Sequence, residues 1–222
     1  MFDFDKSTGE IFLYDDIGPA WLGMIDASTV RSAVKEYDED ARLQVRINSP
    51  GGSVDDGIAI YNMLKRHPGG VDVHVDSLAA SIASYIALAG ETVAVARNGM
   101  FMVHSPWTIA MGNAEDFRDA AAMLDKYQER IEDAYKEKMG VGDDEIKAIM
   151  AAETWYTASE AVDAGLADKT DAPTDEVVAV AAGRFKHTPD ALLRPAKAGS
   201  RTTWNHDAKR YEYQRRRFAR RK

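Results

Sequence analysis

Residues 78–84 read Leu78-Ala-Ala-Ser-Ile-Ala-Ser84, a run of small and apolar residues placed where a strand should give way to a helix. The β-branched stretch 71–75 that precedes this run predicts a buried strand. Ser81 therefore stands at a strand–helix junction, where the positive end of the helix dipole favours developing negative charge. Such a position suits a nucleophile. The simpler interpretation is a small residue that lets a helix pack tightly on a sheet.

Two further strand ends carry groups that could serve the same reaction as a nucleophilic serine. Met100-Phe-Met-Val-His104 is an apolar strand that ends on histidine, and Asn48-Ser-Pro-Gly-Gly52 is a glycine turn between a strand and a helix. Each has an ordinary explanation, because a lone histidine is often a core residue and glycine favours tight turns. Together they supply a base and backbone N–H groups for an oxyanion, as serine acyl transfer requires. The co-occurrence indicates a serine hydrolase.

Strands and helices alternate along the chain, which predicts an α/β fold with a largely parallel sheet. The turn at 97–99, Arg-Asn-Gly, predicts a hairpin between the two strands beside it. A short final helix should open at Thr188-Pro189. The apolar patterns predict strands at 9–14, 43–47, 71–75, 92–96, 100–104 and 177–182, and shorter helices at 29–37, 53–66, 81–90, 143–151 and 157–165.

The stretch 113–139 consists of strong helix formers and predicts one helix of about 40 Å. A compact domain of this size cannot easily cover such a length, so we expect the helix to protrude and to meet a partner. Its apolar positions form one stripe, comprising Phe117, Leu124, Tyr127, Ile131 and Tyr135.

Composition narrows the class of protein. The 222 residues contain no cysteine, which excludes disulfides, thiolate metal sites and cysteine nucleophiles. The first residues lack the basic start and apolar core of a signal peptide, and the longest nearly apolar run, 78–90, is too short to cross a bilayer. We therefore expect a cytoplasmic protein with no membrane partner.

Charge divides the chain into an acidic body, 1–196, and a basic tail, 197–222. The tail holds ten Lys and Arg residues against Asp207 and Glu212, whereas the whole chain has a net charge of −8. We expect a single catalytic domain followed by a solvated tail. Arginines interleaved with aromatics also allow nucleic-acid binding through this tail alone, and docking on the acidic body of a neighbouring subunit is a third possibility.

Four ordered segments resemble the proteolytic subunits of the Clp protease, the ClpP family: Asn48-Ser-Pro-Gly-Gly-Ser53, Ala79-Ala-Ser-Ile-Ala-Ser84, Met102-Val-His-Ser-Pro106 and the stretch 153–168. The resemblance runs from about residue 9 to residue 170. It implies the ClpP/crotonase-like fold of repeated β-β-α units with a long handle helix at about 113–139.

Carried over by position, the resemblance makes Ser81 the nucleophile and His104 the general base. The backbone N–H groups of Gly52 and Ile82 then form the oxyanion hole. The family has aspartate where Glu153 aligns, and a glutamate can still orient an imidazole, so Glu153 is the expected third member of the triad. Two aspartates, Asp163 and Asp168, are alternatives for this role.

The resemblance implies a serine endopeptidase that needs no cofactor or metal and works as rings of seven subunits, often stacked in pairs. A chain this short and plain around the core, with a basic extension, is most similar to ClpP-related head maturation proteases of tailed phages and prophages, which implies phage scaffold or capsid precursor proteins as substrates. The first strand begins by about residue 9, which leaves little room for the N-terminal loops that ClpP uses to engage ATP-driven AAA+ unfoldases. Dependence on such an unfoldase is therefore doubtful. Two rivals stay open: a catalytically silent ring or assembly protein, and a crotonase-like acyl-CoA enzyme.

Overall fold

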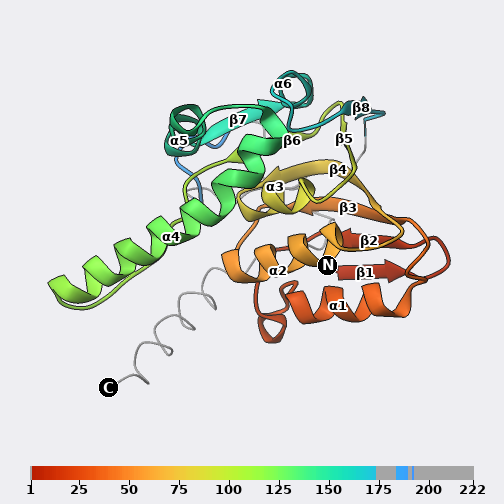
Figure 1. Cartoon of the computed structure of the whole chain (residues 1–222), viewed down its shortest axis with the longest axis horizontal. Helices are drawn as coiled ribbons and strands as arrows, with labels where there is room; N and C mark the ends of the chain where they lie inside the picture. The colour runs from red at the N-terminus through yellow and green to blue at the C-terminus, as the bar shows by residue number, and fades with distance from the viewer. Residues whose placement is uncertain (1, 174–183, 190–191, 193–222) are drawn as a thin grey trace.

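The computed structural model describes residues 2–173, 184–189 and 192 and is built on one mixed sheet (Figure 1). The strand order is β1-β2-β3-β4-β5-β8, and β6 pairs with both β4 and β7. The strands are β1 Phe2–Asp5, β2 Glu10–Leu13, β3 Leu43–Ser49, β4 Val71–Ala80, β5 Thr92–Ala96, β6 Met100–Val103, β7 Thr154–Thr157 and β8 Lys169–Asp171. The helices are the 3-10 turn Ala20–Leu22, α1 Ala27–Glu36, α2 Val54–Lys65, α3 Ile82–Ala87, α4 Ala114–Met139, α5 Asp143–Ala151 and α6 Ala158–Asp163.

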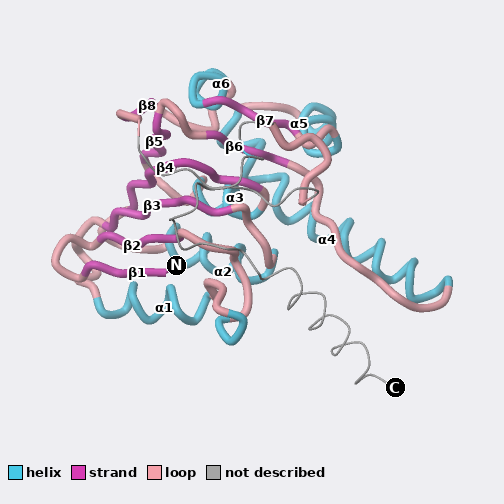
Figure 2. Tube along the Cα trace, turned by 180° about the vertical axis from the view of Figure 1, so that it is seen from behind, coloured by secondary structure: helices cyan, strands magenta, loops and turns pink. Residues whose placement is uncertain are grey.

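The predicted α/β class with a largely parallel sheet is confirmed. The pairs β1–β2 and β6–β7 are antiparallel, and the other strand pairs are parallel. Alternate residues of β3 and β4, such as Val45 and Val73, are fully buried in the main core. Helices α1, α2 and α3 pack on this apolar face, and the view from behind shows the other face of the strands (Figure 2).

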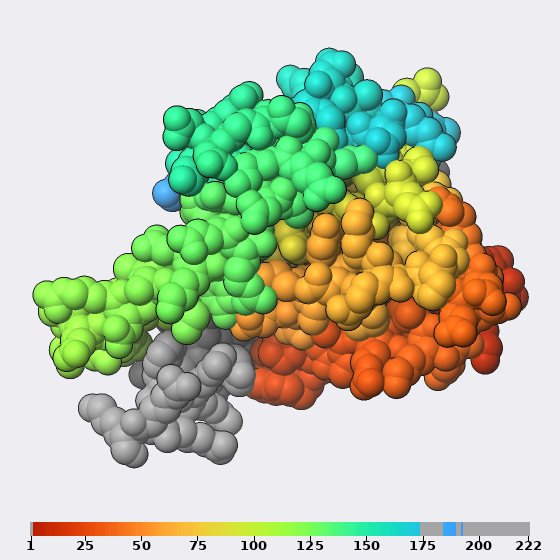
Figure 3. All heavy atoms as spheres, viewed as in Figure 1, coloured from red at the N-terminus to blue at the C-terminus, as the bar shows by residue number. Residues whose placement is uncertain are grey.

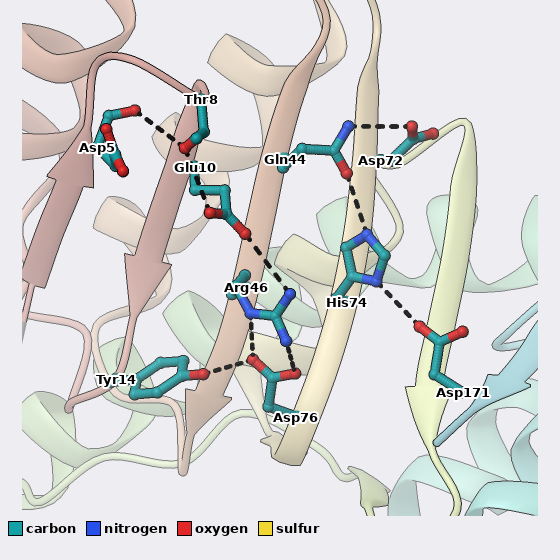
Figure 4. Close-up of polar contacts among 10 residues, drawn as sticks. All are labelled: Asp5, Thr8, Glu10, Tyr14, Gln44, Arg46, Asp72, His74, Asp76 and Asp171. Carbon is teal, nitrogen blue, oxygen red and sulfur yellow. Dashed lines mark hydrogen bonds and ion pairs between the residues drawn. The ribbon is translucent and has the colours of Figure 1, made fainter. Parts of the chain in front are cut away.

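The opposite face of the sheet carries a polar network across neighbouring strands (Figure 4). Arg46 on β3 pairs with Asp76 on β4. His74 lies between Gln44 and Asp171, at 3.0 Å from each through its two ring nitrogens. Both nitrogens of His74 are thus engaged in contacts that join neighbouring strands.

The predicted hairpin between β5 and β6 is wrong. Strand β4 is ten residues long, and β5 pairs with its first half while β6 pairs with its second half, both in parallel. The turn at 97–99 therefore moves the chain along β4 without reversing it. A tight N–H to carbonyl bond from Gly99 to Ala96, 2.7 Å, closes this turn. The turn at 97–99 forms as predicted, but the length of β4 determines which strands pair.

The sequence patterns also missed three strands. β1 pairs with β2, β7 pairs with β6, and β8 pairs with β5. The predicted strand at 177–182 lies outside the described residues. So does most of the predicted final helix, of which only Thr188, Pro189 and Leu192 are described.

Helix α4 is the predicted long helix, and it extends well beyond the body of the molecule (Figures 1 and 3). Asn113 and Asp116 form a reciprocal capping box at its start, and Gly140 ends it in the left-handed conformation, φ 69°. The inner half of its apolar stripe does not face a partner, because Ile131 and Tyr135 are buried in the core of this subunit. The expectation that the whole stripe serves assembly is therefore corrected. Among the described residues, no helix has the length and apolar composition needed to span a membrane.

Candidate active site

Ser81 forms the sharp turn between β4 and α3. Its backbone has φ 56° and ψ −131°, a conformation that non-glycine residues rarely adopt. The N–H of Ser81 donates to the Met102 carbonyl at 2.9 Å, which ties the turn to β6. Such strain costs on the order of 1–3 kcal/mol and is typical of functional sites, where it presents a side chain at an exposed corner.

Ser84 occupies a different environment one turn further on. It is fully buried, and its hydroxyl contacts the Ser81 carbonyl, the Met102 carbonyl and the Tyr135 hydroxyl at 2.6, 3.0 and 2.7 Å. These contacts make Ser84 a buried structural residue beneath the turn.

His104 follows β6 and reaches the serine. Its Nε2 lies 2.7 Å from the Ser81 hydroxyl oxygen. Burial lowers the pKa of His104 to about 4; the Glu153 charge opposes this shift, and the Arg184 and Lys186 charges add to it. The imidazole is consequently neutral near pH 7, the state in which Nε2 can accept a proton.

The glycine turn after β3 lies against the start of α3. Gly51 has φ 86°, and a Cβ there would come within 2.6 Å of the Ala80 carbonyl oxygen, so only glycine fits. The Gly51 carbonyl accepts from Ile17 N–H at 3.0 Å. Because the C=O and N–H of a trans peptide point in opposite directions, the N–H of Gly52 points away from Ile17.

Ile82 is the second residue whose backbone N–H is predicted to bind the oxyanion. It is the first residue of α3, and its N–H is among those that helix geometry leaves without an intrahelical acceptor. The position where a Gly51 Cβ would lie is 2.8 Å from the Ser81 Cβ and 3.0 Å from the Ile82 nitrogen, so the turn and the helix start are in direct contact. This arrangement can present two backbone N–H groups beside the serine.

Glu153 lies before β7 and is the second non-glycine residue with positive φ, at 52°. Only 8% of its surface is exposed. Burial would raise the pKa of its carboxyl, but hydrogen bonds from the backbone N–H groups of Lys186 and His187 lower it overall, with smaller help from Trp155 and His104. Within the described part of the chain no hydrogen bond joins Glu153 to His104, and the carboxylate acts on the imidazole through its charge.

The two alternative acids are placed otherwise. Asp168 accepts from Val93 N–H at 2.7 Å and from the Lys138 ammonium at 2.8 Å, so it fixes the turn after α6. Asp163 is exposed on α6. Glu153 is thus the carboxylate whose charge bears on His104.

A segment that sequence analysis did not single out completes the site. Residues 184–187, here called the strap, lie over the serine and histidine. Arg184 pairs with the buried Asp16, and the Phe185 ring meets the His104 ring edge-on with centroids 5.6 Å apart. Backbone donors have no side-chain signature, and an isolated Arg-Phe pair shows no periodicity, so little in the sequence could have revealed the strap. A cleft at Ser81 is lined by Pro50, Gly52, Val54, Ser81, His104, Pro106, Trp107, Arg184 and Phe185.

The chain is similar in sequence to known proteins. The Clp protease family model matches residues 10–172. The chain is 37% identical over 127 residues to ATP-dependent Clp protease proteolytic subunit 1 of Chlamydia abortus, covering 55% of this chain and 66% of that protein. It is 32% identical over 160 residues to the subunit of the same name from Prochlorococcus marinus, covering 71% and 81%.

A solved structure shares the fold. A ClpP1 mutant from Listeria monocytogenes superposes with a TM-score of 0.64 at 22% identity, covering 76% of this chain and 94% of that one. The predicted ClpP fold is confirmed by this likeness. The strap lies beyond the region matched by the family model.

Proposed function

The chain belongs to the Clp protease family of serine peptidases, and we propose that it cleaves peptide bonds through an acyl-enzyme on Ser81. The observation that carries the proposal is the 2.7 Å contact between the Ser81 hydroxyl and His104 Nε2. This distance is within the range for proton transfer between a nucleophile and its base.

In the proposed reaction, His104 removes the hydroxyl proton as Ser81 attacks the substrate carbonyl carbon. The negative charge that forms on the carbonyl oxygen is bound by the N–H groups of Gly52 and Ile82. His104 then gives its proton to the leaving amine. A water molecule activated by His104 hydrolyses the acyl-enzyme and regenerates the serine.

Glu153 supports the imidazolium that exists during both steps. Because its pKa is lowered, the carboxyl is ionised at neutral pH. A fixed negative charge near His104 stabilises the protonated imidazole more in the transition state than in the resting enzyme.

Labelling with a fluorophosphonate tests the function directly. We expect stoichiometric labelling on Ser81, loss of labelling in Ser81→Ala, and retained labelling in the matched variant Ser84→Ala. A folded wild-type protein that stays unlabelled would favour the silent assembly protein. Binding of coenzyme A without labelling would favour the acyl-CoA enzyme.

Finer features are part of the same proposal. The protruding α4, with Phe117 and Met123 about half exposed, supports assembly into a ring of seven or a stacked double ring. The basic stretch at 197–222 supports phage scaffold or capsid precursors as substrates, with the host cytoplasm as the place of cleavage. Size-exclusion chromatography with light scattering, and cleavage of a purified scaffold protein, test these features separately.

A further inference from the structure

We propose that the strap is a positioning element for the catalytic acid: it holds the Glu153 carboxylate in a fixed place beside His104. Arg184 in turn joins the strap to the glycine turn after β3, residues 50–52, here called the oxyanion loop. The inference rests on the proposed function. It adds a part of the machinery that lies outside the region matched by the family model.

The central contact is a two-point clamp on the carboxylate. Lys186 N–H donates to Oε2 of Glu153 at 2.9 Å, and His187 N–H donates to Oε1 at 2.6 Å. The Trp155 indole adds a longer bond of 3.4 Å to Oε1. Hydrogen bonds to an ionised group are the strong class, and one donor on each oxygen prevents rotation of the carboxylate.

The clamp matters because the acid is a glutamate. Its side chain has one more rotatable bond than an aspartate, and each free rotamer lowers the share of time spent in the productive geometry. The left-handed backbone at Glu153 sets the direction of the side chain. The strap then fixes its end.

The strap is anchored on both sides of the serine. The Arg184 guanidinium pairs with Asp16, which is 1% exposed, and its Nη2 lies 3.5 Å from the Gly51 carbonyl. Phe185 is buried between His104 and Trp155, with ring centroids 5.6 Å from each. One short segment therefore contacts the oxyanion loop, the base and the acid.

A matched pair of substitutions tests the clamp in the full-length protein. Lys186→Pro removes the N–H that binds Glu153, whereas Lys186→Ala removes the same side-chain charge and keeps the N–H. With a fluorogenic peptide, we expect kcat to fall about tenfold to hundredfold in Lys186→Pro relative to Lys186→Ala, with KM little changed. Thermal unfolding of both variants checks that they are folded.

Arg184 provides a second test that leaves the strap backbone unaltered. Arg184→Gln should lower kcat by a similar factor, and Arg184→Lys should recover part of it because a cation can still pair with Asp16. If Lys186→Pro does not fold, this pair decides the proposal.

The pH profile separates positioning from general stability. The charged groups that act on His104 are Glu153, Arg184 and Lys186, and Arg184 is itself paired with Asp16. Without the Lys186 N–H, the pKa of Glu153 should move up towards its ordinary value, so the acid limb of kcat should lie at higher pH in Lys186→Pro than in Lys186→Ala. A merely structural strap would lower the rate equally at every pH.

Three outcomes overturn the inference. Equal kcat in Lys186→Pro and Lys186→Ala shows that the clamp does not assist catalysis. A higher kcat on loss of the clamp or of Arg184 shows that the strap inhibits. A rate loss without any change in the acid limb shows a structural role. Wild-type activity and fluorophosphonate labelling are measured alongside, so failure of the proposed function would be seen as an inert wild type.

Discussion

At the scale of single residues, Ser81 and Ser84 show how two serines one turn apart acquire different roles. Ser81 has a strained backbone and contacts a base, whereas Ser84 is buried with three hydrogen-bond contacts. We expect Ser81→Ala to lower kcat by a factor of about 10⁶ and to leave the free energy of unfolding unchanged or higher. Ser84→Ala should stay active but lose about 1–3 kcal/mol of unfolding free energy. Peptide hydrolysis and urea titration check both, and the reverse pattern would exchange the two roles.

Glu153 gives a prediction that depends on its hydrogen-bond partners. Glutamine keeps the shape but loses the charge, and its NH₂ group cannot accept a bond from a backbone N–H. Glu153→Gln should therefore reduce kcat by about 10²–10⁴ while leaving some activity. Asp163→Asn and Asp168→Asn serve as controls in the same kinetic assay. An unchanged rate in Glu153→Gln with a crippled aspartate variant would move the third role to that aspartate.

His104 and Glu153 together set the acid limit of the enzyme, because both must be unprotonated in the resting site. Burial lowers the pKa of His104 to about 4, so the neutral base persists well below pH 6. The acid limb of kcat/KM should have its midpoint near pH 4, whereas an unperturbed histidine would place it near about 6.5. A midpoint near 6.5 would show that the imidazole is solvated in the working enzyme.

The same shift affects stability. Between pH 6.5 and 4 the unfolded chain binds a proton at His104 that the folded protein does not, so the free energy of unfolding falls as pH falls. The slope from this group should be about 1.4 kcal/mol per pH unit. Denaturant titrations across this range measure the slope, and a flat dependence would contradict it.

At the scale of elements, α4 divides into a part that belongs to the core and a part that is free for assembly. Phe117 and Met123 are 52% and 54% exposed, while Ile131 is 5% exposed. Replacing Phe117 and Met123 together with lysine should give smaller particles in light scattering without unfolding the subunit. Ile131→Lys should unfold it instead. A wild-type protein that is monomeric at working concentration would exclude a role for α4 in assembly.

Most elements of the fold were predictable because their signals are local. The capping pairs at Ser53 and Thr157 and the glycine turn after β3 mark helix starts in the sequence itself. The pairing of β5 and β6 was not predictable, since it depends on how far β4 continues past Val75. In the site, Ser81 and His104 were predictable because each follows an apolar strand that the sequence pattern reveals. The strap acts through peptide N–H groups, which every residue other than proline possesses.

At the scale of the whole molecule, the chain divides into the described body and the basic stretch 197–222, which lies outside the described residues. This stretch carries ten basic residues and follows every residue placed at the site. A protein truncated after Ala196 should hydrolyse small peptides at near wild-type rates. If the tail binds phosphates, the full-length protein should retain nucleic acid at low salt and the truncated protein should not. Failure of the truncated protein to cleave peptides would show that the stretch belongs to the catalytic domain.

The position of the strap has a consequence for how the protein is made. A ribosome releases the chain from its N-terminus onward, so β4, α3 and β6 can fold before residues 184–187 emerge. The clamp on Glu153 is therefore the last part of the site to form. We expect nascent chains arrested before residue 184 to react slowly with a fluorophosphonate and chains arrested well beyond it to react fast. A protease whose site forms in this order has low activity during its own synthesis, when neighbouring nascent chains are still unfolded and open to cleavage.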